Sequence, residues 1–364
     1  MCKTGGKSLG DMEAIDEYRK RLKACLDAEV AANGGSYRKW HDDLSGFRDY
    51  MMRRYIRRRF GRELYWHRFV QGAAGDLLDH HTVSYFAPLE FKRIGWGGRL
   101  LTPQEQVGML SDCLTRGGGR FVYVCLPNKG AVYPDLICDE PGLYQGHTCV
   151  APQWRKYVAD FLQTDVEILD MYPVFRDWVA EHGRSEPLFA KEHNISSTGA
   201  KLVADAIADY LGKTMPSLPR RAKVSQRRIL VHDRSLAVEE CLYLNYDEND
   251  MAYGFRGPVD SDIAIFGDCN LQSYSHLGAG ITGSLAYSLQ YPVFDAGRML
   301  VFDDNRVEDN VMSVDALRAL KSKSLVIYVA FASAPFTRTS ETTRKEVLRR
   351  LSFKNYKWCN FELP

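Results

Sequence analysis

The hydrophobic pattern between residues 102 and 351 alternates between two forms. Continuous apolar runs rich in β-branched and aromatic residues, such as 120–126 and 325–331, are typical of strands that are buried on both faces. Segments with apolar residues three or four positions apart lie between these runs, and this spacing is typical of one helix face. The alternation predicts an α/β fold with a doubly wound, mostly parallel sheet.

The same pattern places the individual elements of this fold. The expected strands are 120–126, 165–170, 263–266, 291–294 and 325–331, and the expected helices are 102–116, 152–163, 172–182, 198–211, 274–289, 313–322 and 339–351. Thr102 and Pro103 are a typical N-cap and first helical residue. Gly212 is a typical C-terminal cap for the helix 198–211.

Helical spacing also covers the start of the chain. It runs through residues 12–33 and 37–60, and the two segments are separated by a Gly-Gly pair at 34–35. We interpret residues 1–62 as an N-terminal helical cap that packs on one α/β domain, residues 63–364.

The pattern changes within the α/β domain after the helix 198–211. Pro216 and Pro219 interrupt the helical spacing, and two short apolar runs follow at 229–231 and 241–244. We therefore expect a small β-rich excursion at about 213–260.

Composition and charge narrow the function classes. The chain has 364 residues, of which 45% are hydrophobic and 26% are charged, so a sizeable core is expected. A net charge of +2 provides no bulk attraction to nucleic acid or membrane, and we expect neither as a partner. The basic run 53–59 fits a solvated helix face or a docking surface for an acidic partner such as a carrier protein.

Cysteine usage and the N-terminus indicate a cytoplasmic protein. The nine cysteines are scattered and show no CxxC pair and no zinc spacing, which is typical of a reducing compartment. The segment Met1 to Lys7 contains no apolar core of a signal peptide. No stretch approaches the length of a membrane span. We predict no metal and no cofactor.

The most informative stretch surrounds Cys269. The apolar run 263–266 ends in Gly267-Asp268-Cys269, and a segment of helical length follows. A strand that ends at glycine and presents a nucleophilic side chain on the turn into a helix is typical of acyl-transfer sites. The helix N-terminus would lower the pKa of the thiol. The alternative is that Cys269 is a small core residue.

Acyl transfer also requires a base, for which the best candidate is His193. It lies in a polar segment directly before the capped helix 198–211, and Glu192 adjoins it as a possible orienting acid. His276 and His147 are alternative bases.

Further candidates follow two of the expected strands. Gly297 could donate its backbone N–H to an oxyanion, and Arg298 could bind an anionic or carbonyl group. Asn128 and Lys129 follow the strand 120–126 and are candidate substrate contacts, as is Asp268 beside the nucleophile. Turn formation is the alternative role for these residues.

Four stretches in a fixed order carry a resemblance to a known family. They are Val124 to Pro134 with Pro127-Asn128-Lys129, Leu188 to Ala200 with His193, Ile265 to Cys269, and Leu325 to Ala332. Together they resemble the SGNH-type alginate O-acetyltransferases, which are similar to SGNH/GDSL hydrolases with a permuted block order, so that the histidine precedes the nucleophile. The resemblance covers roughly residues 100–350. It implies an SGNH-like fold with His193 as base and Cys269 in place of the nucleophilic serine.

The chain departs from the family pattern at three positions. Cys269 replaces the serine, Lys191 replaces the acid two residues before the histidine, and Asn194 replaces a tryptophan. A thiol ionises more readily than a hydroxyl, so it depends less on an acid that orients the base. The family is exported and acts on exopolysaccharide, and that substrate is not transferred to a chain without an export signal.

These observations predict an acyltransferase. The acyl group would move from acyl-CoA or an acyl carrier protein, through a Cys269 thioester, to a hydroxyl or amine of a small molecule or glycan. One alternative is a thioesterase or esterase, in which water is the acceptor. Another is an inactive SGNH-like module that binds a glycan or a protein partner, which the lysine at position 191 favours.

Overall fold

The computed structural model describes most of the chain between residues 9 and 331. The described residues are 9–51, 53–54, 69–71, 77–79, 94–96, 99–190, 194–216, 223–233, 238–253, 258, 260–298 and 320–331. The expected helix 339–351 lies outside them, and of the expected helix 313–322 they include only the last residues.

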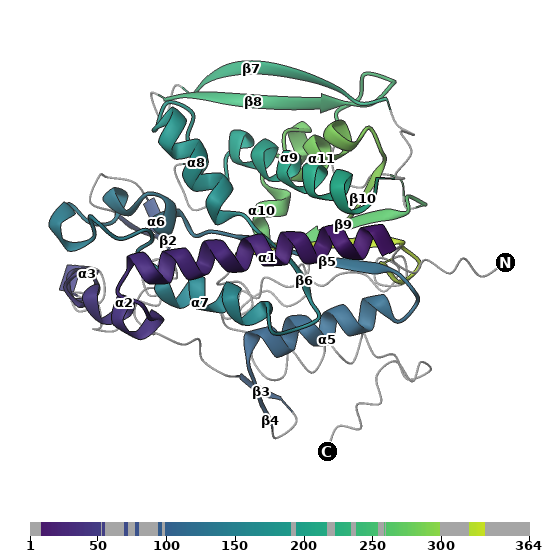
Figure 1. Ribbon diagram of the computed structural model, residues 1–364. Coiled ribbons are helices and arrows are strands. Elements are labelled where there is room, and N and C mark those ends of the chain that lie inside the picture. The colour runs from purple at the N-terminus through teal and green to yellow at the C-terminus, as the bar shows by residue number, and fades with distance from the viewer. Residues whose placement is uncertain are drawn as a thin grey trace.

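A five-stranded parallel sheet forms the centre of the molecule (Figure 1). Its strands, in spatial order, are β10 (Val293–Arg298), β9 (Ile263–Gly267), β11 (Leu325–Phe331), β5 (Arg120–Leu126) and β6 (Glu167–Asp170). This sheet and its helices confirm the predicted α/β fold class.

Helices cover both faces of the sheet. They are α5 (Pro103–Thr115), α7 (Pro152–Phe161), α8 (Tyr172–His182), α9 (Ser197–Thr214) and α11 (Ile281–Leu289). In β5, Tyr123 and Cys125 join a core that includes residues of α5 and α7, whereas Val122 and Val124 join a second core that includes residues of α9 and α11. The continuous apolar run of β5 is thus explained by burial on both faces.

The N-terminal helices pack against this α/β layer. They are α1 (Leu9–Ala32), α2 (Tyr37–Asp43) and α3 (Ser45–Met51), and α1 contacts both α7 and α9. The prediction of one helix over 37–60 was wrong, because the helix ends at Leu44, which leaves helical geometry with φ −86° and ψ 15°. Of the basic run 53–59, only Arg53 and Arg54 are among the described residues.

Residues 225–246 form a long antiparallel hairpin of β7 (Ser225–Asp233) and β8 (Val238–Tyr246). Figure 1 shows it above α9 and α11, on the side of these helices away from the sheet, and β8 contacts both helices. The two short apolar runs expected in this part of the chain lie in these strands. Two further hairpins, β1–β2 (Phe69–Gln71 and Leu77–Asp79) and β3–β4 (Ile94–Trp96 and Arg99–Leu101), precede α5.

Three predicted boundaries need correction. The expected helix 274–289 is divided into the turn η4 (Ser275–Leu277) and α11, because Tyr274 and Gly278 have left-handed φ values of 59° and 71°. Helix α9 continues past Gly212 to Thr214. The expected strand 291–294 is shifted, since β10 extends to Arg298 and includes Gly297.

The connections between the strands change direction near the middle of the sheet. The chain passes from β5 to β6 in one direction and from β9 to β10 in the other, with β11 between β5 and β9. Loops that diverge in this way leave a crevice at the carboxyl ends of a parallel sheet.

In the described part of the chain, no helix is long and apolar enough to cross a membrane.

Candidate active site

The turn after β9 is locked to the neighbouring strand β11. The Gly267 site has no room for a side chain, because an added Cβ would strike the backbone oxygen of Val329. The buried carboxylate of Asp268 accepts hydrogen bonds from the N–H of Asn270 at Oδ1 (2.8 Å) and of Phe331 at Oδ2 (2.8 Å). Asp268 therefore caps the next helix and connects it to β11, which is a structural role for a residue that was expected to contact the substrate.

Cys269 is the first residue of the short helix α10 (Cys269–Gln272). Only its backbone is described. The expected long helix behind Cys269 is a single turn, so the macrodipole contributes less to thiolate stability than a full helix would. The N–H groups of Asn270 and Leu271 are already used by Asp268, through its Oδ1 and its backbone oxygen.

Lys191, Glu192 and His193 lie outside the described residues. The segment that contains them is closed at its base by an antiparallel bridge between Phe189 and Ile195. Ala190 N–H also donates to the Asn194 backbone oxygen at 2.9 Å. Ser196 then caps α9 by accepting from Gly199 N–H.

Asn270 joins the segment of His193 to the turn of Cys269. Its Oδ1 accepts a 3.0 Å hydrogen bond from Ile195 N–H, and its Nδ2 donates to Asp268 Oδ1 at 2.8 Å. Asn270 is completely buried. The residue after the predicted nucleophile thus contacts the residue two positions after the predicted base.

Lys129 holds the other side of the same segment. Its ammonium group donates to the Ala190 backbone oxygen at 3.0 Å, and the residue is buried. Asn128 caps the short helix α6 (Lys129–Val132) by accepting from Gly130 N–H at 2.8 Å. The two expected substrate contacts after β5 therefore shape the loop and the base-bearing segment.

One polar atom in this region is buried without a partner. The Asn194 Oδ1 atom is inaccessible and, in the described part of the chain, accepts no hydrogen bond. Burying an unpaired acceptor costs about 1–3 kcal/mol. Such unpaired groups need an explanation and are often found at functional sites.

The expected oxyanion donor Gly297 lies in a bulge of β10. Arg298 pairs with Gly267 in register, which places this bulge level with the end of β9. Gly297 has φ 85°, and its N–H donates to Asp295 Oδ1 at 2.7 Å. Thr282 donates to the other carboxylate oxygen at 3.0 Å. Burial raises the pKa of Asp295 to about 6, although these two hydrogen bonds oppose the shift.

The two alternative bases lie elsewhere. His147 contacts the Asn33 side chain at the end of α1, with 3.0 Å between Nδ1 and Oδ1, and burial lowers its pKa. His276 is exposed on the turn η4. The described residues include no group of three or more side chains that would suit a metal ion.

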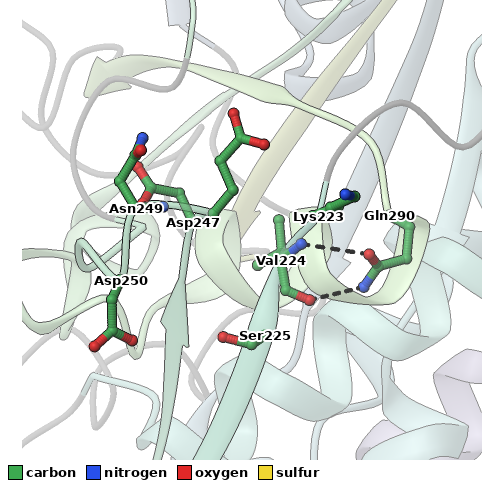
Figure 2. Close-up of a pocket in the computed structure, with 8 residues that line it drawn as sticks. Lys223, Val224, Ser225, Asp247, Asn249, Asp250 and Gln290 are labelled. Carbon is green, nitrogen blue, oxygen red and sulfur yellow. Dashed lines mark hydrogen bonds between the residues drawn. The ribbon is translucent and has the colours of Figure 1, made fainter.

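An open pocket of about 650 Å³ lies where β7 begins and β8 ends (Figure 2). It is lined by Lys223, Val224, Ser225, Asp247, Glu248, Asn249, Asp250 and Gln290. Gln290 holds the Val224 backbone through two hydrogen bonds of 3.3 and 3.0 Å. Gln290 precedes β10, so the pocket lies toward the amino end of that strand, and none of the predicted site residues lines it.

Residues 98–237 match a family model described as the SGNH hydrolase-like domain of the acetyltransferase AlgX. The chain is similar to the SGNH-like alginate O-acetyltransferases. The match confirms the resemblance predicted from the four stretches, and it supports acyl transfer as the general activity class. The matched region contains Lys129 and His193 but ends before Cys269.

The solved structure of AlgX shows the same fold, and two further solved structures are similar to this chain. AlgX of Pseudomonas aeruginosa has a TM-score of 0.53 and 16% identity, over 80% of this chain and 68% of AlgX. The O-acetyltransferase domain of Pseudomonas putida AlgJ has a TM-score of 0.49 and 14% identity, over 78% of this chain and 98% of that domain. PatB1 of Bacillus cereus with a sulfonyl adduct has a TM-score of 0.44 and 11% identity, over 74% and 95% of the two chains. No curated protein sequence matches this chain.

Sequence reasoning missed Asn270, Asp295 and Thr282. Asn270 directly follows the predicted nucleophile, and this position in the sequence was the available signal. Asp295 carried no comparable signal, because its hydrogen bond with Gly297 N–H depends on the bulge that turns this N–H toward it.

Proposed function

We propose that this protein is an acyltransferase in which Cys269 carries the acyl group as a thioester and His193 serves as the base. The observation that carries the proposal is the hydrogen bond from Ile195 N–H to Asn270 Oδ1, which joins the segments of the two predicted residues. The family match supports the reaction class. The donor we propose is a cytoplasmic thioester, either acyl-CoA or an acyl carrier protein.

The first half of the reaction loads the enzyme. His193 accepts the thiol proton of Cys269, and the thiolate attacks the donor carbonyl. The bond between that carbonyl and the donor sulfur breaks, and the released thiolate takes the proton from His193. One thioester replaces another, so the exchange is close to isoenergetic and suits a cysteine better than a serine.

The second half transfers the acyl group. His193 accepts a proton from a hydroxyl or amine of a small molecule or glycan, and that atom attacks the thioester. Cys269 leaves as a thiolate and recovers the proton from His193. Glu192 is the proposed orienting group for His193, in the absence of an acid at position 191.

Backbone N–H groups of Cys269 and Gly297 are the proposed oxyanion donors. Gly297 N–H donates to Asp295 in the structure, so it has to exchange that partner for the oxyanion. Arg298 is the proposed contact for an anionic or carbonyl group of the substrate. Lys129 and Asn128 shape the loop that faces the segment of His193.

The experiment is incubation with a panel of acyl-CoA and acyl-carrier thioesters, followed by intact mass measurement. We expect an acyl adduct that is absent in Cys269→Ala and retained in Cys25→Ala, which removes a half-buried thiol on α1. His193→Ala should load more slowly and fail to transfer. Loss of the adduct in water without an acceptor would instead indicate a thioesterase. No adduct with any donor would indicate the inactive binding module.

A further inference from the structure

Strand β7 is the outer strand of a hairpin with one open edge. All nine of its residues pair with β8, and in the described part of the chain the β7–β8 sheet has no third strand. Figure 1 shows the hairpin at the periphery, outside α9 and α11. The edge of β7 away from β8 therefore presents a row of backbone donors and acceptors with no strand partner among the described residues.

The middle of this strand is apolar and exposed. Ile229, Leu230 and Val231 are 39%, 64% and 37% exposed. Successive strand residues point to opposite faces, so apolar side chains are exposed on both faces of β7. A protein that docked on one face of the hairpin would cover the apolar side chains of that face only. A strand added at the edge of β7 would contact the apolar side chains on both faces.

The charged residues of β7 are compatible with the addition of a strand at its free edge. Arg227 and Arg228 are already paired within the chain, with Asp250 at 2.9 Å and Glu186 at 2.8 Å. No proline or lysine occurs in the strand, although these are common devices that keep edges from pairing.

The sequence of β7 is complementary to itself in one antiparallel register. With Leu230 on a two-fold axis, Leu230 lies opposite its own copy and Ile229 lies opposite Val231. Arg227 then takes the register position opposite Asp233, and Arg228 takes the position opposite His232, so one of these two pairs joins opposite charges and the other joins two basic residues. Apolar and opposite-charge cross-strand pairs both stabilise antiparallel strands.

We propose that β7 pairs antiparallel with β7 of a second copy of this chain, about a two-fold axis at Leu230, to form a four-stranded sheet in the order β8-β7-β7-β8. The interface is isologous, because the same strand contributes from both copies. It lies on the outer side of the hairpin and is independent of the proposed acyl transfer.

The test uses charge variants at the axis, with mass measured by light scattering during gel filtration over a range of concentrations. The wild-type protein should dimerise as concentration rises. Leu230→Lys and Leu230→Glu should each be monomeric, because like charges would lie opposite each other, and an equimolar mixture should recover a heterodimer. Met251→Lys changes a 65% exposed apolar residue outside β7 and should dimerise like the wild type.

Circular dichroism establishes that each variant is folded. A wild-type protein that stays monomeric at every concentration overturns the proposal. This holds also if β7 is found to bind a strand of a different protein. Dimerisation of Leu230→Lys with wild-type affinity also overturns it. Recovery of the dimer only in the mixed sample supports pairing at Leu230.

Discussion

The side-chain oxygen of Asn270 accepts a 3.0 Å hydrogen bond from the backbone N–H of Ile195, 75 residues earlier in the chain. This contact joins the turn of Cys269 to the segment of His193. The acid expected two residues before the histidine is replaced by Lys191. Contacts from Asn270 and Lys129 hold the two flanks of that segment, in addition to the bridge between Phe189 and Ile195 at its base.

Asn270→Ala should uncouple the two halves of the site. The buried Ile195 N–H would lose its acceptor, so we expect a loss of about 1–3 kcal/mol in the free energy of unfolding. Displacement of the base should lower the transfer rate by roughly 100-fold. Urea unfolding measures the stability, and the transfer rate together with the pH dependence of Cys269 alkylation measures the effect on the site. Asn249→Ala, in the exposed turn after β8, is the control.

The conservative variant Asn270→Asp sharpens this test. It keeps an acceptor for Ile195 N–H but replaces the donor to Asp268 with a second carboxylate. Repulsion between the two carboxylates should reduce activity at neutral pH and be relieved as the new carboxyl is protonated at lower pH. Wild-type alkylation rates and transfer rates in Asn270→Ala would contradict the positioning role.

Gly267→Ala should disrupt the turn before Cys269. The added methyl group would strike the Val329 backbone of β11, which cannot move without breaking the sheet. We expect a destabilisation of about 1–3 kcal/mol, as for other overpacked interior sites, and loss of the acyl adduct.

Gly212→Ala is the matched control for this prediction. Gly212 is exposed in α9, and nothing lies within 4 Å of an added Cβ. Alanine should stabilise the helix by about 0.5–1 kcal/mol. Thermal unfolding of both variants measures the difference, and equal effects would show that the contact with β11 is unimportant.

Asp295 should make stability depend on pH. Burial raises its pKa from 3.8 to about 6, so the folded state binds the proton more tightly than the unfolded state. The protein should therefore lose stability as pH rises from about 4 to about 6, by up to roughly 3 kcal/mol, and remain at the lower level above that range.

Asp295→Asn should remove this dependence. The amide oxygen can still accept from Gly297 N–H but the group does not ionise, so the variant should be more stable than the wild type at pH 7. Urea unfolding at several pH values tests this, with the exposed Asp209→Asn on α9 as control. Parallel pH curves for Asp295→Asn and the wild type would refute the assignment.

Arg155→Met should loosen the attachment of the N-terminal helices. Arg155 is fully buried and pairs with Glu29 of α1 at 2.6 Å and with Asp170 of β6 at 2.7 Å. Its removal would leave two buried carboxylates without a counter-ion, which costs about 3–5 kcal/mol.

The comparison for Arg155 is Arg176→Met on α8. Arg176 pairs with its neighbour Asp177 near the surface, so its loss should change stability by less than about 1 kcal/mol. Urea unfolding and limited proteolysis of α1 distinguish the two variants. Similar unfolding midpoints would mean that the buried ion pairs do not hold α1 in place.

Local sequence patterns determined the secondary structure where the deciding residues are close together. The strand 120–126 was predicted with its observed bounds, because an apolar run of this length requires burial on both faces. The start of α5 was also predicted, and Thr102 accepts from Glu105 N–H in a capping box. The prediction of one helix over 274–289 was wrong, because left-handed backbone at Tyr274 and Gly278 interrupts it, and tyrosine rarely adopts that conformation.

The sequence by itself therefore determined the fold class, the order of the motifs and the identity of the candidate nucleophile and base. Only the tertiary structure decided which groups hold these segments together and that Gly297 N–H is already bound to Asp295. The physical reason is distance along the chain. Caps and strand patterns depend on neighbours within a few residues, whereas the contact of Asn270 with Ile195 exists only because the parallel sheet brings their two loops to one edge.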